Sequence, residues 1–289
     1  MLRHAHGGRI VAPSSLSSFL PLFSLLSLIL FLFLTVAPAA FASSSSHRFT
    51  LVGPRKHYLA LGDSLVFGFQ PDLDFSHGYA SDFYNNLQGH GTSALANMGC
   101  PGETSSTFIN GGCPYSYLRK YPYIGAQLAA AVTYLKFYRG QVSPVTLDIG
   151  ANDLLGDINT STCAISSTFN SDLATLDTNL TQTILPQLTA AMTVKGHVTG
   201  DLVMMNYYDP YQNICPNTVP YIQTINQHLA SDVSSYGIIV NVFKSFGGTT
   251  TPNPNICSYT WMCSVFKDIH ATSKGYSVIA STFESGTGY

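Results

Sequence analysis

Hydrophobic residues recur along the chain with two periods, which predicts alternating strands and helices from residue 57 onward. Apolar runs of roughly four to eight residues predict buried strands, and apolar residues three and four positions apart predict helices that lie against a core. The expected strands are residues 57–61, 94–98, 144–149, 202–208 and 237–242. The expected helices are residues 78–87, 124–137, 171–192, 221–235 and 273–283, and Pro186 is expected to kink or split the third of them.

This alternation of strands and helices predicts the α/β class. We expect a single domain of three layers, in which helices cover both faces of a parallel sheet. Ligands of such sheets bind beyond the carboxyl ends of the strands. The chemistry is therefore expected in the turns that directly follow the strands.

The first 42 residues have a different pattern. Arg3 and Arg9 precede an almost continuous apolar run over residues 16–36, and small residues follow it up to Ala42. This is typical of a secretory signal peptide over residues 1–42, so we expect a secreted protein. An uncleaved anchor is the alternative, because the run is close to the ~20 residues that span a bilayer. The small residues after the run favour cleavage.

Residues 43–54 are expected to form a linker, and residues 55–289 to form the domain. No second apolar run is long enough to span a membrane, so no transmembrane span is expected after signal removal.

Composition narrows the class of protein. Of the 289 residues, 45% are hydrophobic and only 10% are charged, which excludes a disordered chain. Lys and Arg number 13 and Asp and Glu number 15, for a net charge of −2. No basic excess is available to neutralise a phosphate backbone, so nucleic acid is not an expected partner. We expect a monomer.

The chain has six cysteines, and all of them follow the predicted signal peptide. An even number in an exported chain predicts three disulfides. A zinc site is the alternative, but no C-x-x-C pair and no histidine at ligand spacing supports it. Sequence proximity suggests the pairs Cys100–Cys113 and Cys257–Cys263, which leaves Cys163–Cys215.

Four short motifs border the predicted strands. They are Gly-Asp-Ser at 62–64, NMGCPGETS at 97–105, Gly-Ala-Asn-Asp at 150–153 and Asp-Ile-His at 268–270. A single Gly-Asp-Ser is usually an ordinary turn. The four motifs in this order and strand context resemble the SGNH hydrolases, also called the GDSL esterase/lipase family, over residues 57–283. The resemblance implies an SGNH/flavodoxin-like fold and an esterase or lipase.

The same motifs contain candidate catalytic residues. A serine hydroxyl is a poor nucleophile until a base takes its proton, and histidine suits that task near neutral pH. Ser64 is the expected nucleophile and His270 the expected base. Attack on an ester creates an oxyanion that needs hydrogen-bond donors. The resemblance assigns these to the Ser64 and Gly102 backbone amides and the Asn152 side chain, with Gly99 as the alternative to Gly102.

The group that orients His270 stays open at this point. The family usually has an aspartate three residues before the histidine, but that position is Lys267 here, and Asp268 lies only two residues before. In an extended segment, successive side chains point to opposite faces. Asp268 in a bulged turn is favoured. The alternatives are a main-chain carbonyl near Lys267, and Asp209, which follows its own strand.

The sequence therefore predicts a secreted serine hydrolase that forms an acyl-enzyme and needs no metal or cofactor. Its substrate is expected to be a small-molecule, lipid or carbohydrate ester. The absence of a long apolar lid segment favours small or carbohydrate-borne esters. The alternative function is an exported binding protein that keeps the fold without catalysis, which the displaced aspartate would explain.

Four tyrosines follow the second motif, at positions 115, 117, 121 and 123. They could line a substrate groove or cover the sheet, and we expect them to cover the sheet.

Overall fold

The computed structural model describes residues 49–289. The predicted signal peptide, residues 1–42, and residues 43–48 of the predicted linker lie outside this description. Residues 49–54 have no regular secondary structure. The amides of Val52 and Gly53 donate to the Asp201 carboxylate over 2.8 and 2.9 Å, so this segment is tied to the domain. None of the helices in residues 49–289 is long and apolar enough to cross a bilayer.

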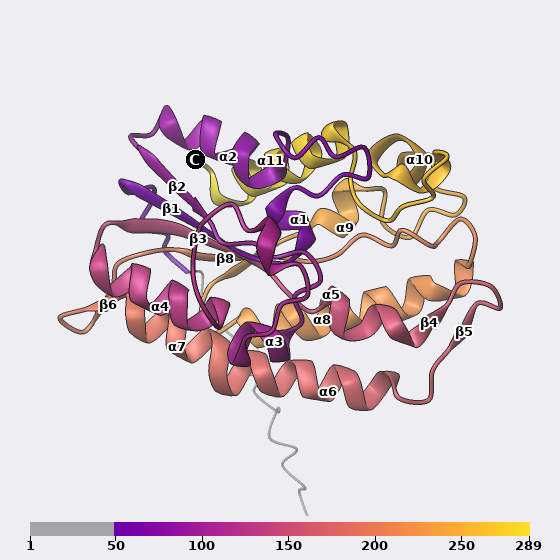
Figure 1. The fold of residues 1–289 in the computed structure, drawn as a ribbon, viewed down its shortest axis with the longest axis horizontal. Coiled ribbons are helices and arrows are strands. Elements are labelled where there is room, and N and C mark those ends of the chain that lie inside the picture. Colours follow the sequence, from indigo (N-terminus) through magenta and orange to yellow (C-terminus); the bar gives the residue numbers. More distant parts are fainter. Residues whose placement is uncertain (1–48) are drawn as a thin grey trace, which may run out of the picture. The chain divides into compact units, whose positions relative to one another are not determined.

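Five parallel strands form the central sheet, in the order β2-β1-β3-β8-β9. Helices lie on both of its faces (Figure 1), so the predicted single α/β domain with a parallel sheet is confirmed. The strands are β1 (His57–Gly62), β2 (Ala94–Asn97), β3 (Val142–Asp148), β8 (Leu202–Met205) and β9 (Ile238–Val240).

Helices α2 (Tyr79–Gln88) and α11 (Ser273–Thr287) cover one face of the sheet (Figure 1). They are joined by the stacked rings of Tyr79 and Phe283, whose centroids are 5.1 Å apart. The other face is covered by α4 (Gln127–Phe137), α6 (Phe169–Asn179), α7 (Leu185–Met192) and α8 (Val219–Val233).

Shorter elements connect these layers. They are the helices α1 (Ser64–Phe67), α3 (Ser105–Asn110), α5 (Ala151–Leu154), α9 (Val242–Ser245) and α10 (Pro254–Tyr259), and two small hairpins, β4 (Ile158–Asn159) with β5 (Ala164–Ile165) and β6 (Thr193–Val194) with β7 (His197–Val198). Short 3₁₀ turns lie at Ser116–Leu118 (η1), Leu155–Asp157 (η2), Pro216–Thr218 (η4) and Trp261–Cys263 (η5).

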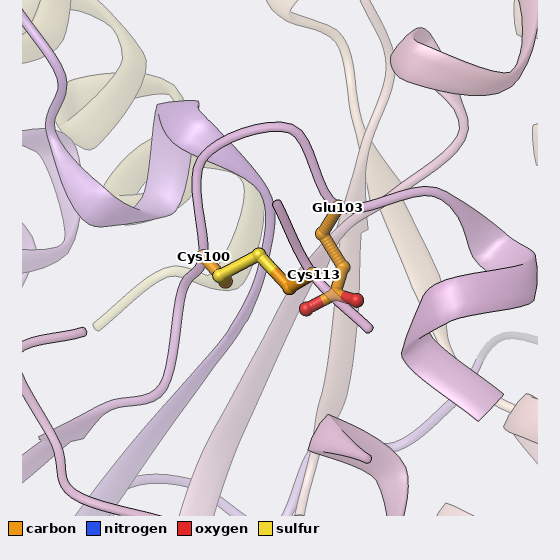
Figure 2. Close-up of side chains that lie close together, drawn as sticks. All are labelled: Cys100, Glu103 and Cys113. Carbon is orange, nitrogen blue, oxygen red and sulfur yellow. A yellow bond between two sulfur atoms is a disulfide. The ribbon is translucent and has the colours of Figure 1, made fainter. Parts of the chain in front are cut away.

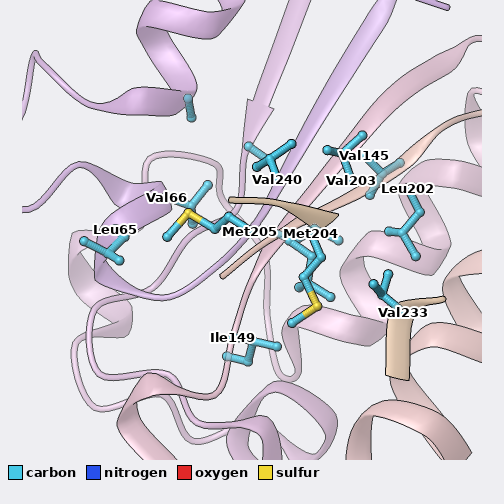
Figure 3. Packing of buried hydrophobic residues seen from close by; sticks show 14 of the residues in the cluster. Leu65, Val66, Val145, Ile149, Leu202, Val203, Met204, Met205, Val233 and Val240 are labelled. Atoms are coloured by element: carbon cyan, nitrogen blue, oxygen red, sulfur yellow. The ribbon is translucent and has the colours of Figure 1, made fainter. Parts of the chain in front are cut away.

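The core lies on both sides of the central strands. All four residues of β8 are buried, as are all seven of β3, because parallel strands between two helical layers meet apolar side chains on each face. Figure 3 shows side chains from β8 beside Ile149 and the helical residue Val233. This packing holds the carboxyl ends of β1, β3 and β8 in fixed positions, and it therefore also fixes where the turns after these strands begin.

Two predicted helices differ from the observed ones. The helix expected over 124–137 begins only at Gln127, because Gly125 has a φ of +77°, which no helix accommodates; Ile124 is left 99% exposed. The helix expected over 171–192 is divided by a π-helical turn, Leu180–Ile184 (η3). Pro186 lies in the first turn of the helix that follows, where its missing amide hydrogen is not needed.

Two predicted strands also end elsewhere. The strand expected over 202–208 stops at Met205. Beyond it, the Asn226 side chain accepts from Tyr207 N over 2.9 Å and donates to Tyr207 O over 2.8 Å, so a side chain replaces the neighbouring strand. The strand expected over 144–149 runs from Val142 to Asp148. The other predicted elements are present with small shifts at their ends.

Candidate active site

The residues that the sequence marks for chemistry meet at the carboxyl ends of β1 and β3. Ser64 begins helix α1 directly after β1, and Asn152 lies in α5 after β3. Gly62, the last residue of β1, pairs with Asp148 of β3. A Cβ atom on Gly62 would lie 1.9 Å from Asp148 Oδ1, and its φ is +137°. Only glycine therefore fits at this junction of strand and turn.

The hydroxyl of Ser64 and the imidazole of His270 are in hydrogen-bonding contact. Ser64 Oγ lies 2.8 Å from His270 Nε2, although 206 positions separate the two residues. The Phe69 ring packs against the imidazole, with 4.6 Å between the ring centroids. A neutral imidazole that carries its hydrogen on Nδ1 can accept the serine proton across this contact, which is what a serine nucleophile needs.

Asp268 lies on the other side of the imidazole. Its Oδ1 is 2.6 Å from His270 Nδ1 and also accepts the backbone N–H of His270 over 2.8 Å. Burial alone would raise the pKa of Asp268, but these hydrogen bonds and the nearby imidazole lower that pKa below its usual range. Lys267 has a φ of +47°, so the segment before Asp268 is a turn and not an extended strand.

Asp209, the other candidate acid, has different partners. Its side chain is fully buried and accepts from Thr218 Oγ1 over 2.6 Å and from Tyr211 N over 2.9 Å. Burial raises the pKa of Asp209. The structure therefore places Asp268, and not Asp209, beside His270.

The segment that carries His270 is held by hydrogen bonds along its length. Trp261 N donates to His270 O over 3.0 Å, and Trp261 O accepts from Asp268 N over 3.3 Å. The hydroxyl of Tyr208 donates to Ile269 O over 2.8 Å. These contacts fix the backbone on both sides of the imidazole.

The three donors that the sequence marks are the Ser64 and Gly102 backbone amides and the Asn152 side chain, and Ser64, Gly102 and Asn152 all line the same cavity. Within residues 49–289, no group accepts a hydrogen bond from the Ser64 or Gly102 backbone amide. Asn152 Nδ2 donates to Glu103 O over 2.9 Å and lies 3.4 Å from Asp63 Oδ2. The second distance is long for a hydrogen bond, so one amide hydrogen of Asn152 is only weakly held.

The structure also separates the two candidate glycines. Gly102 has a φ of +80° and lines the cavity in front of Ser64. Gly99 instead packs against α1, where a Cβ atom would lie 2.3 Å from Val66 Cγ1, and its amide already donates to Asn97 Oδ1 over 3.1 Å. Gly102 is thus the one whose amide is available to a bound molecule.

Gln127 is a residue of this region that the sequence analysis missed. It is fully buried, and its Oε1 accepts from Gly62 N over 2.7 Å. Its Nε2 donates to Gly62 O over 2.9 Å and to Glu103 Oε2 over 3.0 Å. One amide therefore joins the turn of Ser64 to the loop of Gly102. The only signal in the sequence is a polar residue at the apolar start of a helix.

Three disulfides are present in the described chain. Cys100, Cys113 and the Glu103 carboxylate lie together (Figure 2), with ligand atoms within 4.8 Å of one another. The two sulfurs are bonded to each other and so are not available to a metal ion. The bond closes the loop that contains Gly102. The pairs are those that sequence proximity suggested: Cys100–Cys113, Cys163–Cys215 and Cys257–Cys263.

Two carboxyl groups are buried beneath the nucleophile. Asp63 Oδ1 accepts from Leu65 N over 2.9 Å, whereas neither oxygen of Asp148 has a hydrogen-bond partner among residues 49–289. Burial raises the pKa of both groups, and the negative charge of Asp63 also raises the pKa of Asp148.

A cavity of about 680 Å³ opens beside Ser64. Its wall includes Ser64, Gly102, Asn152, Asp268 and His270, together with Tyr115 and Tyr117. The expectation that Tyr115 and Tyr117 cover the sheet is therefore wrong, because both line the cavity, on the segment that follows Cys113; Tyr121 and Tyr123 do pack against the core.

The comparisons with known proteins agree with this geometry. The model of the family described as GDSL-like lipase/acylhydrolase matches residues 58–283. No curated protein matches the chain.

Several solved structures share the fold. The lipase Lip_vut3 from a goat rumen metagenome has a TM-score of 0.55 at 17% identity, over 81% of this chain and 97% of that one. Axe2, an acetylxylan esterase from Geobacillus stearothermophilus, has a TM-score of 0.51 at 13% identity, over 83% and 97%. An extracellular lipase from Streptomyces rimosus has a TM-score of 0.50 at 17% identity, over 80% and 99%.

Proposed function

Because the chain belongs to the GDSL-like lipase/acylhydrolase family and is a hydrolase of carboxylic esters, we propose that it acts through an acyl-enzyme on Ser64. The observation that carries this proposal is the continuous contact from Ser64 Oγ to His270 Nε2 and from His270 Nδ1 to Asp268 Oδ1, over 2.8 and 2.6 Å. This arrangement has the nucleophile, base and orienting acid of a serine hydrolase in order.

In the first step, His270 Nε2 takes the hydroxyl proton while Ser64 Oγ bonds to the ester carbonyl carbon. The negative charge on the carbonyl oxygen is stabilised by the amides of Ser64 and Gly102 and by the weakly held hydrogen of Asn152. The imidazolium then gives its proton to the leaving alcohol as the C–O bond breaks. A water deprotonated by His270 releases the acid. Asp268 keeps its charge and stabilises the imidazolium.

The binding-protein alternative loses its support in this geometry. It rested on the displacement of the aspartate in the sequence, but Asp268 Oδ1 lies 2.6 Å from His270 Nδ1.

We further infer that the protein is a secreted monomer, with a signal peptide at 1–42, a linker at 43–54 and the catalytic domain at 55–289. Three disulfides support export, because such bonds persist in oxidising compartments.

The test uses a fluorophosphonate probe and p-nitrophenyl acetate. The probe should add one label to the oxidised protein, on Ser64, and abolish turnover. Ser64→Ala should keep the fold, take no label and lose nearly all activity. Ser285→Ala, on the exposed side of α11, is the matched control and should behave as the wild type. Labelling elsewhere, or full turnover by Ser64→Ala, would overturn the assignment.

A further inference from the structure

The cavity beside Ser64 is enclosed mainly by hydrocarbon. Its deep wall is formed by buried or half-buried side chains from α5, the segment that follows it, the segment after β8, and α8. Its outer wall is formed by exposed or half-buried side chains on the segments after α1 and α3. The deep wall includes Leu154, Leu155, Ile158, Tyr207, Ile222 and Ile225. The outer wall includes Leu73, Phe75, Tyr115, Tyr117 and Leu118.

The charged and amide side chains of this cavity are confined to the catalytic end. The charged or amide side chains of the wall are Asp63, Asn152, Asp268 and His270. On the deep wall, the Tyr208 hydroxyl already donates to Ile269 O over 2.8 Å. The other side-chain polar atom of that wall is the Tyr207 hydroxyl. A sugar bound there would bury several hydroxyls without partners, which costs free energy for each of them.

We propose that this cavity binds the acyl chain of a fatty ester, and that the preferred acyl group has eight carbons or more. The proposal rests on the proposed function of Ser64. The volume of about 680 Å³ is in the usual range for a pocket that encloses a whole small-molecule ligand, whereas an acetyl group would leave most of it to water. The preference for small or carbohydrate-borne esters, expected from the missing lid segment, is replaced by this one.

The positions of the catalytic groups set the direction of the chain. The leaving alcohol must face His270 Nε2, which protonates it, and the carbonyl oxygen must face Gly102 and Asn152. The acyl chain takes the remaining direction. Asn152 lies in α5 and Leu155 directly follows that helix, three positions later, and both line the cavity, so a chain that passes Asn152 next meets Leu155 and the deep wall.

The first experiment measures kcat/KM of the wild type for p-nitrophenyl esters of two to ten acyl carbons, each below its aggregation concentration. Burial of one additional methylene group can raise kcat/KM by at most about fourfold. We expect kcat/KM to rise at least tenfold from the acetate to the octanoate. A flat or falling series with turnover that requires Ser64 would overturn this inference and leave the proposed function intact. No turnover of any ester would overturn the proposed function itself.

The second experiment fills the deep wall. Ile158→Trp and Leu155→Trp should each lower octanoate turnover more than tenfold and change acetate turnover less than threefold, because both side chains are only half-buried and can be enlarged. Ile124→Trp, on the exposed surface, is the matched control and should change neither. Equal losses for both esters in folded variants would show that the chain does not lie along this wall.

Discussion

One carboxylate oxygen of Asp268 accepts two hydrogen bonds from the same residue, the ring Nδ1 of His270 over 2.6 Å and its backbone N–H over 2.8 Å. The imidazole is thus fixed relative to its own main chain. The contact also requires the hydrogen of a neutral ring to lie on Nδ1, which leaves Nε2 free to accept from Ser64. Both features follow from an aspartate two positions before the histidine in a turn.

Asp268→Asn should lower kcat by roughly 10³- to 10⁴-fold with little change in KM, because the wrong ring tautomer and an unsupported imidazolium both raise the barrier. Steady-state kinetics on p-nitrophenyl butyrate measure this. Asp209→Asn is the comparison, since Asp209 is buried away from the imidazole; it should lower stability and leave kcat near the wild-type value. A decrease in kcat of less than tenfold for Asp268→Asn would show that a main-chain group, and not Asp268, orients His270.

Gly102→Ala should lower kcat by about tenfold or more. Its φ of +80° disfavours any side chain, and the new Cβ would lie 3.3 Å from Pro114 Cγ, so the amide that faces the cavity must shift. Gly112→Ala is the matched control: its φ is +95°, it lies in the same disulfide loop, and nothing lies within 4 Å of the new Cβ. Both variants should lose stability, but only the first should lose kcat. Equal values of kcat for the two variants would show that the Gly102 amide does not stabilise the oxyanion.

Gln127→Leu should lower the free energy of unfolding by about 3 kcal/mol, because it leaves the buried N–H of Gly62 without an acceptor and Glu103 Oε2 without its donor. The carbonyl of Gly62 keeps the N–H of Cys100 as a donor. The substitution should also lower kcat, since the turn of Ser64 and the loop of Gly102 lose their common support. Urea unfolding and initial rates test the two effects. Gln88→Leu, at the exposed end of α2, should change neither quantity. Wild-type stability in the folded Gln127→Leu protein would contradict the prediction.

The buried carboxyl of Asp148 should make stability fall as pH rises. Its pKa is raised in the folded protein, so above the ordinary value of about 4 the folded state keeps a proton that the unfolded state has lost. Each pH unit above that value then costs up to about 1.4 kcal/mol, until the folded pKa is reached. Asp148→Asn should flatten this dependence and stabilise the protein at pH 8, and the two proteins should converge near pH 4. Denaturant unfolding between pH 4 and 8 measures it.

The control for this prediction is Asp72→Asn, at an exposed position, which should keep the wild-type slope. If Asp148→Asn retains that slope too, the slope comes from another group, such as Asp63, whose pKa burial also raises.

The general plan of the fold was predictable because it depends on local patterns. Runs such as 202–205 are apolar on every position, as a strand buried on both faces must be, and they place the turns that follow them. The ends of the helices and strands were harder to predict from the sequence. Ile124 continues the helical spacing of the residues after it, and only the backbone angle of Gly125 shows that the helix has not yet begun.

Part of the candidate site lay beyond sequence reasoning for a geometric reason. The alternation of side chains that made Asp268 doubtful applies to extended backbone, whereas Lys267 has a φ of +47° and the aspartate folds back onto His270. Gln127 reaches Gly62 across 65 positions of the chain, and the cavity wall comes from segments with no common motif. Such contacts depend on tertiary packing and leave no local signature.

The separation of Ser64 and His270 by 206 positions has a consequence for the newly made protein. A chain that is still emerging from the ribosome already contains the turn of Ser64, but its hydroxyl has no base beside it and is as inert as that of any serine. Ester hydrolysis can begin only when the segment before α11 has docked on the completed sheet. The protein therefore cannot hydrolyse esters until synthesis and folding of the whole domain are complete.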